Sequence, residues 1–201
     1  MTTTQQRAFL YGPVLFGAYG VIRLLDGIDG VKGPGLAWTA GHLCFLAGLA
    51  FFAQGFAAMR RSAVEKVAGR DRWSLAGLWI GGAGIAALVV QFGADIVTGL
   101  ISADHAEMGD RVGDFQALPG VELAFYILGP LLFFVGQFLL TGRLAALRTL
   151  KVWAPALVLA DSLLSYTVKD LIPLGAVMLV LSYAPLWRGT ADTSRAALVK
   201  A

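Results

Sequence analysis

Long apolar stretches separated by short charged connections constrain the fold of this chain more than any other feature of its sequence. A helix of about 20 mostly apolar residues is long enough to cross a hydrocarbon core about 30 Å thick. Only 14% of the 201 residues are charged and 57% are hydrophobic, whereas soluble domains carry about 25% charged residues. We therefore expect an all-α, polytopic, integral membrane protein.

The sequence predicts a bundle of six transmembrane helices. The expected spans cover residues 8–28, 35–58, 74–101, 119–141, 152–167 and 170–187. Together they form one transmembrane domain, residues 1–188, because no segment outside the spans is long enough to fold alone. Residues 189–201 are expected to form a flexible cytoplasmic tail.

The positions of the basic residues predict the orientation of the bundle. With the N-terminus in the cytoplasm, twelve of the sixteen Lys and Arg residues fall on the cytoplasmic side, as the positive-inside rule requires. Six spans then place both termini in the cytoplasm. We expect the protein in the cytoplasmic membrane of a bacterium. The basic residues need no nucleic-acid partner to explain them, because they lie at the ends of the spans.

Polar and ionisable residues recur in the expected spans, mostly toward the non-cytoplasmic side. Charged side chains in hydrocarbon cost at least about 2.5–3.5 kcal/mol, so they face the bundle interior and find partners. Many lie three, four or seven residues apart, on one helix face. We therefore expect a shared polar pocket beneath the outer leaflet. The candidate catalytic residues are Asp161, Glu122 and Asp95, and the candidate substrate-binding residues are Arg23, Asp26, His42, Trp38, Gln91, Tyr126 and Tyr166.

Each candidate also has a structural interpretation. Acids near the ends of spans can mark the membrane interface, and Glu122 follows Pro119–Gly120, where an acid stabilises a helix N-terminus. His42 can serve only as an interhelical hydrogen-bonding residue. Arg23 is expected to pair with Asp26, Asp95 or Asp161, and such a pair can be purely structural.

The pattern favours a membrane-embedded enzyme acting on a lipophilic, isoprenoid- or sterol-like substrate. A carboxylic acid would donate a proton, and aromatic faces would stabilise the developing cation, as in a cyclase or isomerase. One alternative is a proton- or cation-coupled transporter or transporter subunit, although the inner halves of the spans carry few polar residues. A second alternative is a non-catalytic protein that binds a lipid or a partner chain.

Two further segments bear on partners. Gly77 and Gly81 form a G-x-x-x-G pair, which we expect to pack within the bundle, with a homo-oligomer contact as the alternative. Residues 102–119 contain four acids, and we expect a mobile acidic loop there, with a lid or a divalent-cation site as alternatives. The sequence contains no cofactor motif and no recognised metal-binding motif, so we expect neither group.

Overall fold

Every regular element in the described part of the chain, residues 2–28 and 30–189, is a helix in the computed structural model. The all-α expectation is therefore confirmed, whereas the expected tail, apart from Gly189, lies outside the described residues. The helices are α1 (Thr3–Asp26), α2 (Leu36–Val67), α3 (Arg72–Ile101), α4 (His105–Ala117), the π-helix η1 (Glu122–Leu128), α5 (Gly129–Ala146), α6 (Trp153–Thr167), the 3₁₀ turn η2 (Lys169–Leu171), α7 (Ile172–Ser182) and α8 (Ala184–Trp187).

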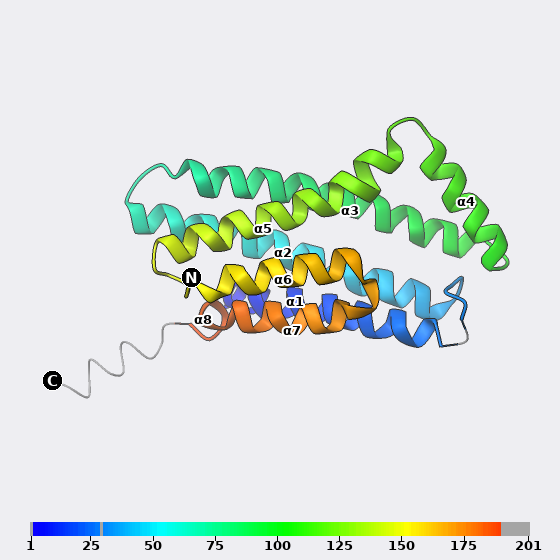
Figure 1. The fold of residues 1–201 in the computed structure, drawn as a ribbon, viewed down its shortest axis with the longest axis horizontal. Helices are drawn as coiled ribbons and strands as arrows, with labels where there is room; N and C mark the ends of the chain where they lie inside the picture. Colours follow the sequence, from blue (N-terminus) through cyan, green and yellow to red (C-terminus); the bar gives the residue numbers. More distant parts are fainter. Residues whose placement is uncertain (1, 29, 190–201) are drawn as a thin grey trace.

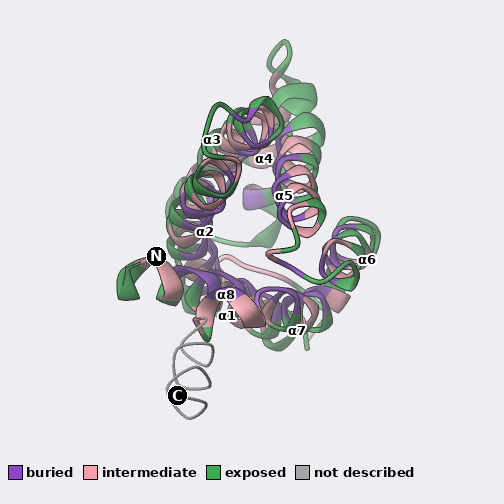
Figure 2. Cartoon of the chain, turned by 90° about the vertical axis from the view of Figure 1, so that its left-hand side faces the viewer, coloured by how far each residue is buried: buried purple, intermediate pink, exposed green. Residues whose placement is uncertain are grey.

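The long helices form a ring around a common interior. Going around it, α1 packs against α2, α2 against α3, α3 against α5, α5 against α6, α6 against α7, and α7 against α1. Figure 1 shows these helices running side by side, and Figure 2 shows the ring from one end. The N-terminus and the α2–α3 and α5–α6 connections lie at one end, whereas α4 and the α1–α2 turn lie at the other.

Four helical stretches are long and apolar enough to cross a membrane, fewer than the six that the sequence predicts. They are Thr3–Asp26, Leu36–Val67, Arg72–Ile101 and Glu122–Ala146. The remaining two expected spans form α6, with 15 residues, and α7, with 11. A 15-residue helix is only about 22 Å long. The second of these spans is divided at Tyr183, because Pro185 has no N–H to continue the α-helical hydrogen bonds.

The acidic segment between α3 and α5 is a helix, so the expectation of a mobile loop was wrong. Asp104 caps α4 by accepting a hydrogen bond from the Glu107 N–H at 2.9 Å, and Glu107 in turn accepts one from the Ala103 N–H at 2.7 Å. The Ala103 N–H and the Arg111 guanidinium hold the pKa of the Glu107 carboxyl below its usual value. This Asp-x-x-Glu spacing resembles the capping box that begins many helices.

Glycine allows α3 and α5 to approach each other closely. Gly77 and Gly81 both face α5, and a Cβ on Gly136 of α5 would overlap the backbone of Gly81 and lie 2.7 Å from the carbonyl oxygen of Gly77. The expectation that the G-x-x-x-G pair packs within the bundle is therefore confirmed. Gly82, on the same helix, has open space around its Cα and takes no part in this contact.

Asp71 joins three helices at the end of the bundle that carries the α2–α3 and α5–α6 connections. Its side chain is only 2% exposed and accepts hydrogen bonds from Arg143 Nε of α5 at 2.9 Å and from the Trp73 N–H at the start of α3. Arg60 of α2 donates a long hydrogen bond to its backbone carbonyl. Burial opposes ionisation of Asp71, but the hydrogen bonds from Arg143 and Ser74 outweigh it and hold the pKa of Asp71 below its ordinary value of 3.8.

Replacing Asp71 with alanine is expected to lower the free energy of unfolding by about 2–4 kcal/mol, because Arg143 loses its buried partner and α3 loses its cap. Thermal unfolding in detergent measures this loss, with Asp110→Ala on the exposed face of α4 as the control. Since the folded-state pKa is lowered, the carboxylate contributes fully above pH 3.8, and its contribution falls as the pH drops through the lowered pKa. A pH-independent difference between the wild type and Asp71→Ala, persisting below that pH, would contradict this assignment.

Candidate functional site

A cavity of about 600 Å³ lies inside the ring, at the end where α4 crosses the bundle. All but one of the sequence-predicted site residues line it. The nine that do are Arg23, Asp26, Trp38, His42, Gln91, Asp95, Glu122, Tyr126 and Tyr166. They come from α1, α2, α3, η1 and α6, so the shared pocket expected from the sequence is present as a geometric feature.

Asp95 lies at the centre of the polar wall of this cavity. It is 8% exposed, and its Oδ1 accepts a hydrogen bond from the Tyr126 hydroxyl at 3.1 Å. Its Oδ2 lies 3.7 Å from Nε2 of His42, which is an electrostatic contact slightly too long for a direct hydrogen bond. Three helical elements thus bring an imidazole, a carboxyl and a phenol together.

The backbone of α2 fixes the tautomer of His42. Its Nδ1 lies 2.7 Å from the carbonyl oxygen of Trp38, one turn earlier. A carbonyl oxygen only accepts, so Nδ1 carries a hydrogen and Nε2 is left to face Asp95. A neutral imidazole and an ionised carboxylate would place two lone pairs opposite each other. A protonated imidazole would instead present an N–H to the Asp95 carboxylate.

Trp38 connects this pair to the α3 backbone. Its indole Nε1 donates to the carbonyl oxygen of Asp95 at 2.9 Å, and the same carbonyl accepts from the Thr98 hydroxyl at 3.0 Å. The Trp38 ring also lies against His42, with a centroid separation of 4.1 Å. Its close packing against Gly99 leaves no room for a Cβ there. These contacts hold the imidazole and carboxyl in one geometry, which acid–base chemistry requires.

Aromatic rings form the deeper wall of the cavity. Phe45 and Phe92 stack with centroids 3.7 Å apart, and Tyr19 meets both of them edge to face. His42 lies 5.1 Å from Phe92 between centroids. The ionisable pair is thus bordered by ring faces, which attract positive charge and exclude water.

The π-helix η1 carries Tyr126 to Asp95. All seven residues of η1, Glu122–Leu128, are exposed or half-buried, and the segment continues directly into α5. A π-helical turn is wider than an α-helical turn and is uncommon except as a short insertion near functional sites. Glu122 lies in its first turn, on the cavity side but exposed.

Four exposed residues belong to the cavity lining. They are Glu122 and Ile127 of η1, Tyr166 of α6 and Lys169 of η2. Tyr166 and Ile127 keep 50% and 41% of their surfaces exposed. The part of the lining that reaches the exterior therefore comes from η1, α6 and the α6–α7 turn.

Charged residues gather at the outer edge of the cavity, but not in the expected pairs. Arg23 contacts Asp170 at 3.9 Å rather than Asp26, Asp95 or Asp161, and Lys32 contacts the same carboxylate at 3.6 Å. Asp26 instead accepts a hydrogen bond from the Gly33 N–H, in the α1–α2 turn. The expected Arg23 pairing was wrong because η2 brings Asp170 closer than the acids of α3 and α6. Nε of Arg23 is buried without a hydrogen-bond partner.

Asp161 is the one predicted site residue outside the cavity lining. It is fully buried between α6 and α7, where its Oδ1 accepts a hydrogen bond from the Ser165 hydroxyl at 2.9 Å. Ser165 does line the cavity. Direct donation of a proton from Asp161 to a cavity-bound molecule, as expected from the sequence, is therefore not what this geometry offers.

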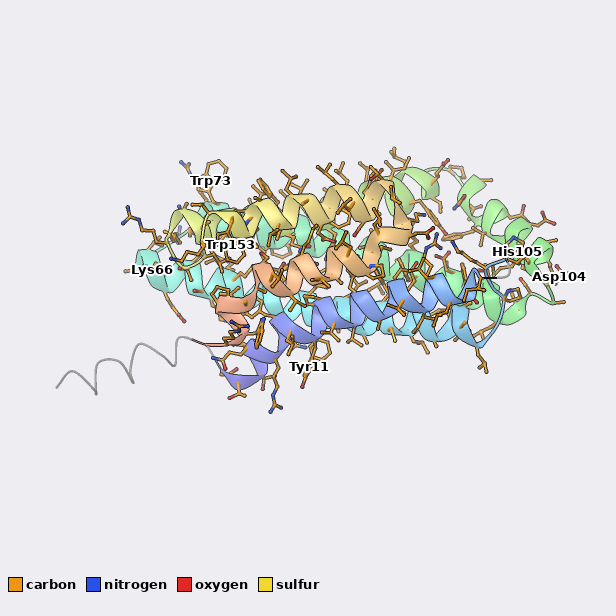
Figure 3. The ribbon with its side chains drawn as sticks, turned by 60° about the horizontal axis from the view of Figure 1, so that its bottom comes forward. Tyr11, Lys66, Trp73, Asp104, His105 and Trp153 are labelled. Carbon is orange, nitrogen blue, oxygen red and sulfur yellow. The ribbon has the colours of Figure 1, made fainter. Side chains whose placement is uncertain are left out.

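The candidate set from the sequence lacks five polar lining residues, Tyr19, Lys32, Gln116, Ser165 and Lys169. Lys32 lies in the α1–α2 turn, and Gln116 belongs to α4, the segment expected to be a loop. Only the Asp104–Glu107 spacing could have indicated that this segment is a helix, which places Gln116 in the cavity wall. Figure 3 shows Asp104 and His105 at this end of the molecule, and the His105 ring contacts the Lys32 carbonyl at 2.9 Å.

Within the described residues, no group of three or more His, Cys, Asp or Glu side chains is arranged to hold a metal ion. The acidic side chains of α4 do not form such a group either. Compared with protein-family models, curated proteins and solved structures, the chain shows no match to any of them. The cavity is therefore the feature of this molecule from which a function can be proposed.

Proposed function

We propose that this protein is a membrane-embedded enzyme that isomerises or cyclises a lipophilic, isoprenoid- or sterol-like molecule by acid–base chemistry in the His42–Asp95–Tyr126 cavity. The observation that carries the proposal is the contact between Nε2 of His42 and Oδ2 of Asp95 at 3.7 Å, inside an aromatic-lined cavity. The locked tautomer leaves Nε2 as the proton-transferring atom.

The same geometry suggests how a proton would move. With Asp95 ionised and His42 protonated, Nε2–H would give its proton to a carbon of the substrate, and Asp95 would stabilise the imidazolium beforehand. Loss of a proton from a second carbon back to Nε2 would complete an isomerisation with no net change in the enzyme. The rings of Phe92 and Tyr19 would stabilise the intervening cation.

The size and polarity of the cavity support an amphipathic ligand. Its volume of about 600 Å³ lies in the range typical of small-molecule sites. The aromatic wall suits an apolar body, and an opening between η1 and α6, where Ile127 and Tyr166 are exposed, would give access from lipid. Arg23, whose Nε is unpaired, and Lys32 suit a carbonyl or anionic group at the outer end.

Deuterium exchange tests the proposal before the substrate is known. The protein would be purified from its native membrane and incubated in D₂O, and its organic extract would be analysed by mass spectrometry. An isomerase should incorporate deuterium into the co-purified molecule, and His42→Gln should abolish this incorporation. A molecule that stays bound but gains no deuterium in the wild type would instead indicate a lipid-binding protein.

For the membrane arrangement we propose six spans, with both termini in the cytoplasm of a bacterium. In support, α6 and α7 complete the ring alongside the four long helices. Trp73 and Trp153 are 58% and 46% exposed at the end that carries the α2–α3 and α5–α6 connections, as expected for an interfacial belt. These two connections and the helix ends beside them carry eight of the sixteen Lys and Arg residues, Arg60, Arg61, Lys66, Arg70, Arg72, Arg143, Arg148 and Lys151, whereas α4 at the other end carries three acidic residues, Glu107, Asp110 and Asp114.

Single cysteines test this orientation. In a Cys44→Ser background, which removes the only native cysteine, Asp110→Cys on α4 should react with a membrane-impermeant maleimide in intact cells. Arg70→Cys, in the α2–α3 connection, should react only after the membrane is permeabilised. The reverse pattern would invert the orientation.

A proton-coupled carrier is a second candidate, favoured by one observation. Buried polar side chains continue inward from the cavity, because Gln137, Asp161 and Tyr183 all lie 0–1% exposed in the interior. A carrier would use such residues as a proton path across the bundle. Proteoliposomes loaded with the co-purified molecule distinguish the candidates: efflux driven by a pH gradient indicates a carrier, and chemical conversion without such efflux indicates an enzyme.

A further inference from the structure

A second polar cluster, separate from the cavity lining, is buried among α5, α6 and the end of α7. It consists of Gln137, Asp161 and Tyr183, which are between 0% and 1% exposed. The Tyr183 hydroxyl lies beside the Gln137 amide and interacts electrostatically with the Asp161 carboxyl. Such burial is costly for polar groups unless each of them finds a partner.

The partners are missing for both donors and acceptors. Asp161 Oδ2, the Gln137 Oε1 and Nε2 atoms and the Tyr183 hydroxyl make no hydrogen bond of ordinary length and angle, although the Gln137 amide lies close enough to the Tyr183 hydroxyl to interact with it. A cation would satisfy only the oxygen atoms, whereas the cluster also contains the Gln137 NH₂ donor. Protons and bridging water satisfy both kinds of group, since water donates and accepts.

The surroundings of Asp161 also favour a proton at this position, because they provide no counter-ion. Its neighbours are the Ser165 hydroxyl on α6 and the backbone of Gly175 on α7, and it interacts electrostatically with the Tyr183 hydroxyl. None of the ion pairs among the described residues includes Asp161. An ionised Asp161 carboxylate in this position has no counter-ion, whereas a protonated carboxyl is neutral and needs none.

Ser165 connects this cluster to the cavity. Its hydroxyl donates to Asp161 Oδ1 at 2.9 Å, and Ser165 is itself part of the cavity lining. One side chain therefore contacts both compartments. A hydroxyl can pass a proton, because it donates one hydrogen while its lone pairs accept another.

We infer that Asp161, Gln137 and Tyr183 form a proton-binding site that exchanges its proton with the cavity through the Ser165 hydroxyl. On loading, the Ser165 O–H bond breaks as an O–H bond forms at Asp161 Oδ1, and the serine oxygen takes a proton from hydronium in the cavity. Asp161 becomes neutral, Ser165 is unchanged, and water is the product. Unloading reverses these steps. The site does not depend on the reaction proposed above.

Infrared spectroscopy of the ligand-free protein tests this inference. Protein labelled with ¹³C at its aspartate carboxyl groups should show a C=O band of a protonated carboxyl at neutral pH, and Asp161→Asn should remove that band. After transfer to D₂O, Ser165→Ala should keep the band but exchange its proton about 100-fold more slowly than the wild type.

Ser162→Ala is the matched control, because Ser162 lies on the same helix but donates to the Val158 carbonyl rather than to Asp161. It should exchange like the wild type. Equal rates in Ser165→Ala and the wild type would overturn the relay. A band that appears only when Na⁺ is replaced by choline would show that a cation occupies the site. Should Asp161→Asn fail to fold, the labelled wild type and the two serine variants still decide the question.

Discussion

Asp95→Asn is expected to reduce deuterium incorporation into the co-purified molecule by about 100- to 10,000-fold, the range typical for loss of an acid–base group. Asparagine keeps the size of the side chain and an oxygen that can accept from Tyr126. It removes the negative charge that stabilises a protonated His42 across 3.7 Å. The amount of bound molecule should change little, so quantitative mass spectrometry of the extract separates binding from turnover.

Two variants serve as references for Asp95→Asn. Tyr126→Phe removes one hydrogen bond to the carboxylate but leaves its charge, so the loss should be smaller, about tenfold. Asp110→Asn, on the exposed face of α4, should have no effect. If Asp95→Asn kept more than half of the wild-type rate, the His42–Asp95 pair would have no catalytic role.

The largest effect on folding is expected from Gly136→Val. Its side chain would overlap the backbone of Gly81 and crowd the Gly77 carbonyl oxygen, so α3 and α5 would have to separate. Overpacking of a single side chain costs about 1–3 kcal/mol, and here the clash is with a backbone that cannot rotate away. We expect a loss of at least about 3 kcal/mol and little monodisperse protein after extraction in detergent.

Gly82→Val is the control for this substitution. Gly82 lies on α3, one residue after Gly81, but no atom lies within 4 Å of a Cβ built there. This variant should unfold at the wild-type temperature. Should Gly82→Val destabilise the protein as much as Gly136→Val, the face that carries Gly82 would be in contact with a second copy of the chain.

Four of the six expected spans and the shared cavity could be predicted because each follows from local spacing. Hydrocarbon demands long apolar helices, and residues three or four apart share a helix face, as with Trp38 and His42 or Asp95 and Thr98. Once the faces with polar side chains turn inward, a ring of helices brings them together. A shared polar cavity can therefore be predicted without knowing which helices are neighbours.

Other features depend on interactions that spacing does not determine. Tyr126 reaches Asp95 from the π-helix η1. No residue pattern in Glu122–Leu128 predicts a π-helix. Arg23 pairs with Asp170 because the turn between α6 and α7 falls beside it. Asp161 faces α7 and Ser165 rather than the cavity, because Gly175 leaves room for its carboxyl there.

The central claim is that the cavity beside His42 and Asp95 holds a lipophilic molecule, and quantitative mass spectrometry of the purified protein tests it most directly. The wild type should retain close to one equivalent of such a molecule. Ala37→Trp, which fills the cavity, should lose it, and Ala86→Trp, on the exposed face of α3, should keep it. Equal amounts in all three proteins, or no bound molecule in the wild type, would contradict the proposed function.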